Sequence, residues 1–195
     1  MCDGAFFTPM KRIFVIIDGS NFYHKIKSIT PEIADTTHFN YRGLCEKLTF
    51  GGSIVSINYY IGIVHAKRND LRGQQLRKNQ NRLFYHLKSP KQNINVIGGY
   101  LMRNGNSFHE KGVDVNMAVD LLIGAFKDTY DLAILISSDS DLIPAIKEVR
   151  KLGKEIEFVG FQVSPSLGLI KYATKTTLLS TEDLTAFASV DISHS

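Results

Sequence analysis

The sequence predicts an α/β protein built on one open, mainly parallel sheet with helices on both faces. Two stretches carry this prediction. Leu132–Ile136 is an uninterrupted apolar run, long enough for a strand and too apolar to have a solvated face, and helical spacing begins soon after it at Leu142. Arg12–Ile17 repeats the pattern, because it leads into a helical stretch with Phe22 and Ile26 on one side. Repeated strand–helix units are typical of parallel sheets.

The next elements follow from composition and turn signals. Thr30–Asn40 has turn-forming residues without a period and is predicted to be a loop. Tyr41–Phe50 predicts a short helix that Gly51–Gly52 brings to an end. Ser53–Ile63 is rich in β-branched and aromatic residues and predicts a strand, whereas Asn69–Lys88 predicts the longest helix.

The middle of the chain predicts one more strand and a strong helix. Asn93–Met102 has strand character interrupted by Gly98–Gly99, and Arg103–Asn106 predicts a hairpin-type or flexible turn. The stretch from His109 to Asp114 is predicted to lead into an amphipathic helix. Its apolar members are Val115, Ala118, Val119, Leu122, Ile123 and Phe126.

The C-terminal third completes the expected sheet. Glu155–Gly160 predicts a strand, Ser164–Ser166 a helix start, and Lys175–Leu179 a last strand at the sheet edge. Ser180–Asp183 has the pattern of a capped helix start. Because no repeat, low-complexity tract or linker interrupts the chain, we expect residues 1–195 to form a single domain with a core of about 12–179 and a C-terminal helix at 181–188.

Composition limits the classes of protein that fit. The chain has 195 residues, of which 44% are hydrophobic and 22% charged, as in a soluble globular domain, and its net charge of +4 is compatible with a polyanionic partner. Cys2 and Cys45 have no paired spacing, which argues against a disulfide framework or a zinc motif and favours a reducing compartment such as the cytoplasm. No apolar run approaches the length that a membrane span or a signal peptide needs.

Four aspartates lie where the chain is expected to enter a helix: Asp18, Asp114, Asp139 and Asp141. For any single one, capping of a helix N-terminus is the simpler interpretation. As a set the four aspartates predict a cation site. Parallel strands that end at one edge of a sheet would bring them together, and carboxylates that lie close together repel one another unless a cation is bound. Oxygen ligands without His or Cys suit Mg²⁺ or Mn²⁺, ions that catalyse phosphodiester cleavage.

Three motifs resemble those of the NYN domain family. This family belongs to the PIN-like metal-dependent nucleases, and the resemblance is to its LabA-like branch. The three motifs are, in this order, Phe14–Asn21 (FVIIDGSN), Lys111–Val115 (KGVDV) and Ser137–Asp141 (SSDSD). The resemblance extends from about Arg12 to Leu179. It implies a three-layer α/β/α sandwich with a Rossmann-like, PIN-like sheet, and a metal-dependent endoribonuclease activity.

The resemblance also implies roles for individual residues. By motif position the catalytic residues are Asp18, Asn21, Asp114, Ser137, Asp139 and Asp141, with the four aspartates as ligands of Mg²⁺ or Mn²⁺. Ser138 stands where the family pattern has a glycine. Asp120 matches the pattern too, but it lies about 9 Å further along the helix than Asp114 and is turned away from it, so we expect a supporting role.

A basic stretch at and along the longest predicted helix is a candidate surface for binding nucleic acid. Its cations are Arg68, Arg72, Arg77, Lys78 and Arg82. Two interpretations remain open, a solvated basic face and a surface that contacts the phosphates of single-stranded RNA. We expect no membrane partner, and the sequence leaves open whether the chain forms a homo-oligomer or binds a protein partner.

Three other classes of protein compete with the nuclease. A Toprim-type site also uses an Asp-x-Asp pair, but it has Glu where Asp18 stands. A von Willebrand A-like metal site matches Asp18–Ser20 in part, but it has Ser where Asn21 follows. A catalytically silent PIN-like module that binds RNA or a protein would keep the same acids, so the sequence does not separate it from an active enzyme.

Overall fold

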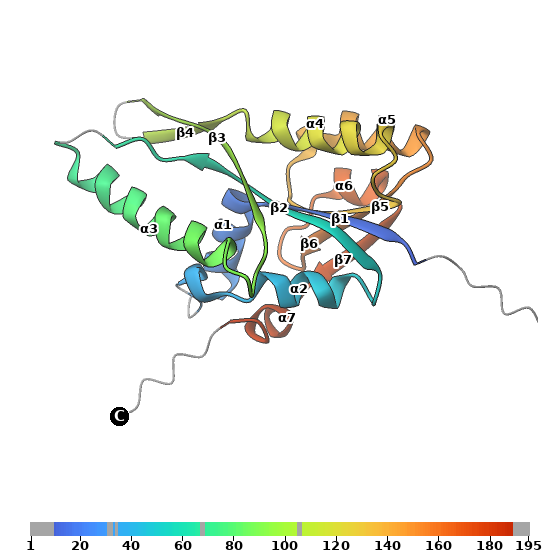
Figure 1. Cartoon of the computed structure of the whole chain (residues 1–195), viewed down its shortest axis with the longest axis horizontal. Coiled ribbons are helices and arrows are strands. Elements are labelled where there is room, and N and C mark those ends of the chain that lie inside the picture. Colours follow the sequence, from blue (N-terminus) through green and yellow to red (C-terminus); the bar gives the residue numbers. More distant parts are fainter. Residues whose placement is uncertain (1–9, 31–32, 34, 67–68, 105–106, 189–195) are drawn as a thin grey trace, which may run out of the picture.

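The computed structural model describes residues 10–30, 33, 35–66, 69–104 and 107–188, which form a seven-stranded sheet in the order β4-β3-β2-β1-β5-β6-β7 (Figure 1). All neighbouring strands are parallel except β3 and β4. The strands are β1 (Arg12–Asp18), β2 (Ser53–Ile63), β3 (Asn95–Asn104), β4 (Ser107–Lys111), β5 (Leu132–Ile136), β6 (Glu155–Phe161) and β7 (Lys175–Leu179). The predicted open, mainly parallel sheet is confirmed.

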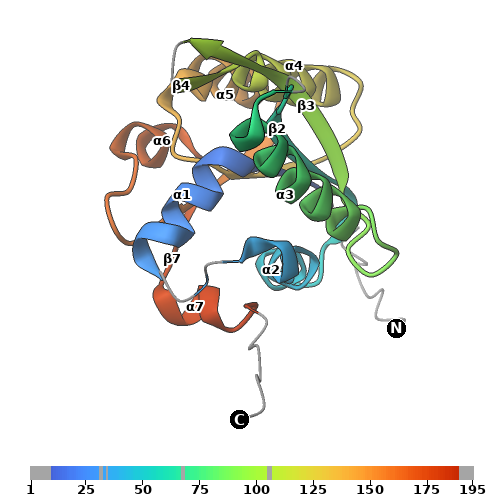
Figure 2. The same cartoon turned by 90° about the vertical axis from the view of Figure 1, so that its left-hand side faces the viewer.

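Helices cover both faces of the sheet, as predicted (Figures 1 and 2). One face carries α1 (Gly19–Ile29), the 3₁₀ turn η1 (Thr36–His38), α2 (Tyr41–Leu48), α3 (Leu71–Leu87) and α7 (Thr181–Thr185). The other carries α4 (Val113–Phe126), the 3₁₀ turn η2 (Ser140–Leu142), α5 (Ile143–Lys151) and α6 (Leu167–Tyr172). No helix in the described ranges has the length and apolar character to cross a membrane.

The central strand β1 shows why the chain folds into three layers. Ile13, Val15 and Ile17 belong to the apolar core on the α1 side, whereas Phe14 and Ile16 belong to the core on the α4 side. Side chains of a strand alternate between the two faces of a sheet, so a strand that is apolar at every position must be covered on both. This requirement produces the α/β/α sandwich.

The hairpin formed by β3 and β4 differs from the sequence prediction. Asn104 pairs with Ser107, and the ladder continues to the pair Tyr100–Lys111, so residues expected to lead into α4 form an antiparallel edge strand instead. Gly98–Gly99 does not interrupt β3 but pairs in register with β2. A Cβ on Gly99 would lie 2.7 Å from the carbonyl oxygen of Lys111, so glycine permits the two strands to approach.

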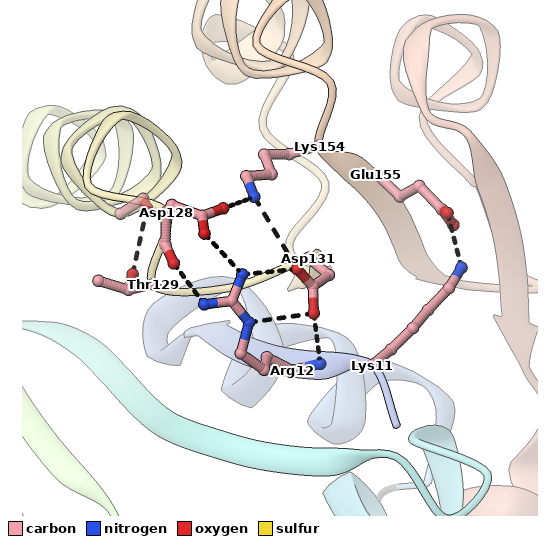
Figure 3. Close-up of polar contacts among 8 residues, drawn as sticks. Lys11, Arg12, Asp128, Thr129, Asp131, Lys154 and Glu155 are labelled. Atoms are coloured by element: carbon pink, nitrogen blue, oxygen red, sulfur yellow. Dashed lines mark hydrogen bonds and ion pairs between the residues drawn. The ribbon is translucent and has the colours of Figure 1, made fainter. Parts of the chain in front are cut away.

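A network of ionic side chains joins β1, the loop before β5 and the loop before β6 at the amino edge of the sheet (Figure 3). We call Arg12, Asp128, Asp131 and Lys154 the amino-edge network. Arg12 donates to Asp131 through Nη2 at 2.7 Å, Nε at 3.1 Å and its backbone N–H at 2.8 Å. Lys154 forms an ion pair with Asp128. Because Arg12 opens β1 and Asp18 closes it, this network lies at the opposite end of the strand from the predicted site.

Candidate active site

Two of the acidic residues at the carboxyl edge of the sheet, Asp18 and Asp139, lie at or just after the ends of its central strands β1 and β5. Asp18 ends β1, and Ser137 follows β5, whose last residue Ile136 pairs with Ile17. The Ser137 hydroxyl donates to Oδ2 of Asp18 at 2.8 Å, and both side chains are buried. Parallel pairing of β1 and β5 therefore joins two residues that are 119 positions apart in the sequence.

The same serine also fixes the loop that carries the second acid. The backbone N–H of Asp139 donates to Oγ of Ser137 at 3.1 Å, so one hydroxyl links Asp18 to Asp139. Asp139 in turn caps η2, because its Oδ1 accepts from the backbone N–H of Asp141 at 2.8 Å. Ser138, which replaces the expected glycine, is half-buried in this loop.

Asp18 is also the N-cap of α1. Its Oδ1 accepts from the backbone N–H of Asn21 at 3.0 Å, so the capping interpretation describes part of what this residue does. The helix begins so close to β2 that a Cβ on Gly19 would lie 2.2 Å from Cε1 of Tyr59. Glycine at this position therefore permits the tight strand-to-helix junction that orients Asp18.

The third acid enters from the opposite helical layer. Asp114 lies in the first turn of α4 and is exposed. The N-cap of α4 is Gly112, whose φ of 80° is in the left-handed region that favours glycine. This backbone conformation turns the chain from the end of β4 into α4, and so it places Asp114 at the same edge of the sheet as Asp18.

Three of the four predicted acids share one hollow, which we call the acidic cleft. It has a volume of about 580 Å³ and is lined by Asp18, Ser20, Asn21, His24, Lys25, Ser28, Asp114 and Asp139. The exposed Asp141 is not among these lining residues. Within the described part of the chain, no three His, Cys, Asp or Glu side chains lie close enough together to hold a metal ion.

The donor chemistry of the acidic cleft nevertheless fits a hard divalent ion. The cleft offers three carboxylates, and Oδ1 of Asn21 is a buried oxygen without a hydrogen-bond partner among the described residues. A buried amide oxygen without a donor is costly, and coordination of a bound cation or its water would satisfy it. Asp18, Asn21, Asp114 and Asp139 are therefore the residues that could hold the metal.

Sequence reasoning missed four residues of the acidic cleft, which are Ser20, His24, Lys25 and Ser28. All four lie on α1. His24 and Lys25 follow Ser20 and Asn21 by three to five positions, and Ser28 follows them by another three or four, so these residues share one face of the helix. That spacing is the signal that could have identified them. Lys25 brings a positive charge into the cleft, and its Nζ donates to the carbonyl oxygen of Ser164 at 3.3 Å.

Asp120 lies outside this lining and has a structural contact. Its Oδ2 accepts from the hydroxyl of Tyr60 at 2.7 Å, which ties α4 to β2. Burial, together with the bond to Asp120, raises the pKa of Tyr60 well above its ordinary value, so the hydroxyl remains a donor. Tyr60 pairs with Asp18 across β1 and β2, so the bond to Asp120 fixes the strand residue next to Asp18.

The cations predicted to bind nucleic acid lie on α3, apart from Arg68, which is outside the described residues. Arg72, Arg77, Lys78 and Arg82 are exposed, and the described residues provide none of them with an ion pair. A hollow of about 860 Å³ runs between α3 and η1, and we call it the outer groove. Its lining includes Asp35, His38, Arg77, Lys78, Arg82 and Tyr85.

A parallel α/β sheet with acids at the carboxyl ends of its central strands defines a class of proteins that bind ligands at that edge. The family model that matches this chain is that of the NYN domain, over residues 12–180. The chain therefore belongs to the NYN domain family, which confirms the resemblance seen in the sequence. NYN domains are PIN-like nucleases, generally dependent on a divalent metal, so family membership supports nuclease function and nucleic-acid binding at this general level.

Solved structures include a chain with the same fold. It is a protein of unknown function, VPA0982, from Vibrio parahaemolyticus, and it is 19% identical with a TM-score of 0.62. The alignment covers 90% of this chain and 96% of that one, and at this identity the likeness shows the fold alone. A search of curated proteins finds no match.

Proposed function

We propose that this protein is a divalent-metal-dependent endoribonuclease that hydrolyses single-stranded RNA at the acidic cleft. The observation that carries the proposal is the meeting of Asp18, Asp114 and Asp139 from β1, α4 and the loop after β5 in one hollow of an NYN domain. The metal would be Mg²⁺ or Mn²⁺, because the available donors are carboxylate and amide oxygens. The reducing cytoplasm expected from the cysteines is part of the same proposal.

Several residues in and beside the acidic cleft have a defined task in this proposal. A bound divalent ion would supply an acidified water and charge neutralisation on the phosphate. Ser137 holds Asp18 and the Asp139 loop in fixed positions through its two hydrogen bonds. Asn21 contributes a neutral oxygen that orients a ligand or water, and Lys25 offers a cation to a phosphate of the substrate. Asp141 is exposed and does not line the cleft, and we propose that it contacts the substrate or the metal as either enters.

A catalytically silent module is the second candidate, and one observation favours it. The described acids of the cleft are not gathered closely enough to hold a metal as they stand. A site that holds the ion through all three carboxylates would need Asp114 and Asp139 to move toward Asp18, whereas an ion held by one or two carboxylates and waters would not. A module that only binds RNA or a protein partner requires no such movement, and the two candidates differ in whether the purified protein cleaves RNA.

Cleavage of labelled single-stranded RNA in Mg²⁺, Mn²⁺ or EDTA tests the proposal. We expect wild-type protein to cut with either ion and to stop in EDTA. Asp139→Asn keeps the shape of the side chain and removes its charge, so cleavage should fall by about 100-fold or more, given that partners of metal ligands alone contribute about 10- to 100-fold. Glu148→Gln, an exposed acid on α5, provides a charge-matched control and should cut like wild type.

Thermal unfolding of each variant separates loss of activity from loss of fold. Equal cleavage by wild type and Asp139→Asn, or equal cleavage with and without EDTA, would contradict the proposed site. Failure of folded wild-type protein to cut RNA in either metal, together with retained RNA binding, would assign the chain to the silent module.

A further inference from the structure

A third hollow connects the acidic cleft to the outer groove, and we call it the middle pocket. It has a volume of about 460 Å³ and lies between α1, β2 and α3, which share one face of the sheet (Figure 2). Ser20 and His24 line both the middle pocket and the acidic cleft. Arg82 and Asp35 line both the middle pocket and the outer groove. The three hollows therefore lie next to one another between α3 and the acids of the acidic cleft, and we call this series of hollows the path.

The walls of the middle pocket combine apolar and aromatic side chains with polar ones. Tyr23 of α1, Ile61 of β2, and Leu76 and Leu83 of α3 all contribute to its lining. Gln80 fixes α3 against β2, because its amide donates to the carbonyl oxygen of Gly62 at 2.8 Å and accepts from the backbone N–H of Val64 at 2.9 Å. This contact fixes α3 beside the pocket, where Tyr23, Ile61 and Leu83 offer apolar surface to the face of a flat ring.

The rim of the path has the opposite chemistry. Arg77, Lys78 and Arg82 project from α3 into the outer groove, and the described residues offer no ion-pair partner to these cations. The acid of the groove, Asp35, is engaged by the Thr37 hydroxyl at 2.5 Å and by His38. A polyanion would supply the charge that balances the rim.

We propose that the middle pocket holds an unpaired base of the RNA strand, while Arg77, Lys78 and Arg82 hold the phosphates that lead into it. This inference rests on the proposed function, and it identifies how that site would select its substrate. A nucleic-acid single strand combines the two chemistries of the path, since it has apolar base faces and a charged backbone.

The same arrangement predicts a preference for single strands over duplexes. A base enters a pocket between aromatic and apolar side chains only when it is free to leave its stack, and bases of a duplex are paired and stacked. The phosphates of a duplex would still meet the cations of α3, but Tyr23 would contribute nothing to that contact. Loss of Tyr23 should therefore weaken binding to a single strand and leave binding to a duplex unchanged.

Binding measured in EDTA with the Asp139→Asn protein tests this inference without any cleavage. The probes are a labelled oligouridylate, a strand of equal length with abasic sites in place of bases, and a duplex RNA. Addition of Tyr23→Ala should weaken oligouridylate binding about tenfold, the contribution of one stacked base, and should not change binding of the other two probes. Tyr23→Phe retains the ring and should restore binding.

Matched variants on the opposite helical layer provide the controls. Phe126→Ala removes an exposed aromatic of α4, and Lys127→Gln with Lys151→Gln removes two exposed cations; neither change should affect any probe. Arg77→Gln with Arg82→Gln should weaken binding of all three probes. If the Tyr23→Ala variant does not fold, the Tyr23→Leu variant takes its place in the comparison, because leucine keeps apolar volume but has no aromatic ring.

Two results would overturn the inference whatever the outcome of the cleavage assay. One is unchanged oligouridylate affinity on loss of the Tyr23 ring in a folded protein. The other is an equal loss of affinity for oligouridylate and the abasic strand, which would give Tyr23 a role in the backbone contact and remove the base from the pocket. Because no metal or cleavage enters this experiment, its failure is distinguishable from failure of the proposed nuclease.

Discussion

Ser137 has more influence on the acidic cleft than its small side chain suggests. It is buried at the end of β5, where its hydroxyl donates to Asp18 and accepts from the backbone N–H of Asp139. A carboxylate buried without a full set of donors is destabilised, so this hydroxyl stabilises the charged form of Asp18, an acid of the proposed site. The serine thereby couples the positions of two acids that belong to different strands.

Replacement of Ser137 by Ala tests this coupling. We expect the free energy of unfolding to fall by about 1–3 kcal/mol, because a buried acceptor loses its donor. Cleavage should fall about 10- to 100-fold, and the affinity for Mn²⁺, measured by calorimetry, should fall with it. Ser138→Ala is the matched control, since the Ser138 side chain makes no hydrogen bond with another described residue. A loss of stability with unchanged Mn²⁺ affinity would restrict Ser137 to a structural role.

The sequence predicts some residues of the acidic cleft and not others, and the difference has a physical reason. Asp18 and Asp139 follow apolar strands directly, and the carboxyl ends of neighbouring parallel strands meet at one edge, so their proximity could be expected. His24 and Lys25 lie within a helix, at a spacing that places them on the same face as Asn21, but the rotation of α1 about its axis decides whether that face lines the acidic cleft. That rotation depends on packing against β2, which a single sequence does not display.

At the level of elements, the sequence indicated a hairpin-type turn after β3 but not the edge strand β4 that pairs with it. Four of the five residues of β4, Ser107–Lys111, are polar or charged, and such composition is typical of edge strands as well as of loops. β4 is extended because its backbone pairs with β3 in an antiparallel ladder, and not because of its own composition. Parallel strands inside the sheet are apolar on both faces, and these were predicted close to their observed bounds.

The basic face of α3 gives a prediction about salt. If Arg77 and Arg82 contact phosphates, the double substitution to Gln should weaken binding of single-stranded RNA and flatten its dependence on salt concentration. The slope of log affinity against log salt should decrease by about 0.7 for each lost contact on a single strand. Titrations at several KCl concentrations would measure it, and a slope equal to that of the Lys127→Gln, Lys151→Gln control would assign α3 to the solvated basic face.

Across the whole molecule, the amino-edge network and the proposed catalytic residues lie at opposite edges of one sheet. β1 spans seven residues, about 20 Å, from Arg12 in the amino-edge network to Asp18 in the acidic cleft. The hydrogen bonds from Arg12 lower the pKa of Asp131 from its ordinary 3.8 to about 2. A carboxyl whose pKa is lower in the folded chain than in the unfolded chain stabilises the fold above its unfolded pKa, and that contribution is lost as the pH falls from about 4 to about 2.

Asp131→Asn therefore should reduce stability without reducing cleavage. Because the Asp131 side chain is 36% exposed, solvent screens the pair, and we expect a loss of about 1 kcal/mol in the free energy of unfolding at pH 7. Denaturant unfolding between pH 2 and pH 7 should show a shallower acid dependence for the variant than for wild type, and the two curves should approach each other near pH 2. Single-stranded RNA cleavage at pH 7 should equal that of wild type, whereas Asp139→Asn should show the reverse combination, full stability with lost cleavage. A fall in cleavage for folded Asp131→Asn would show that the two edges are coupled through β1 and would contradict this division.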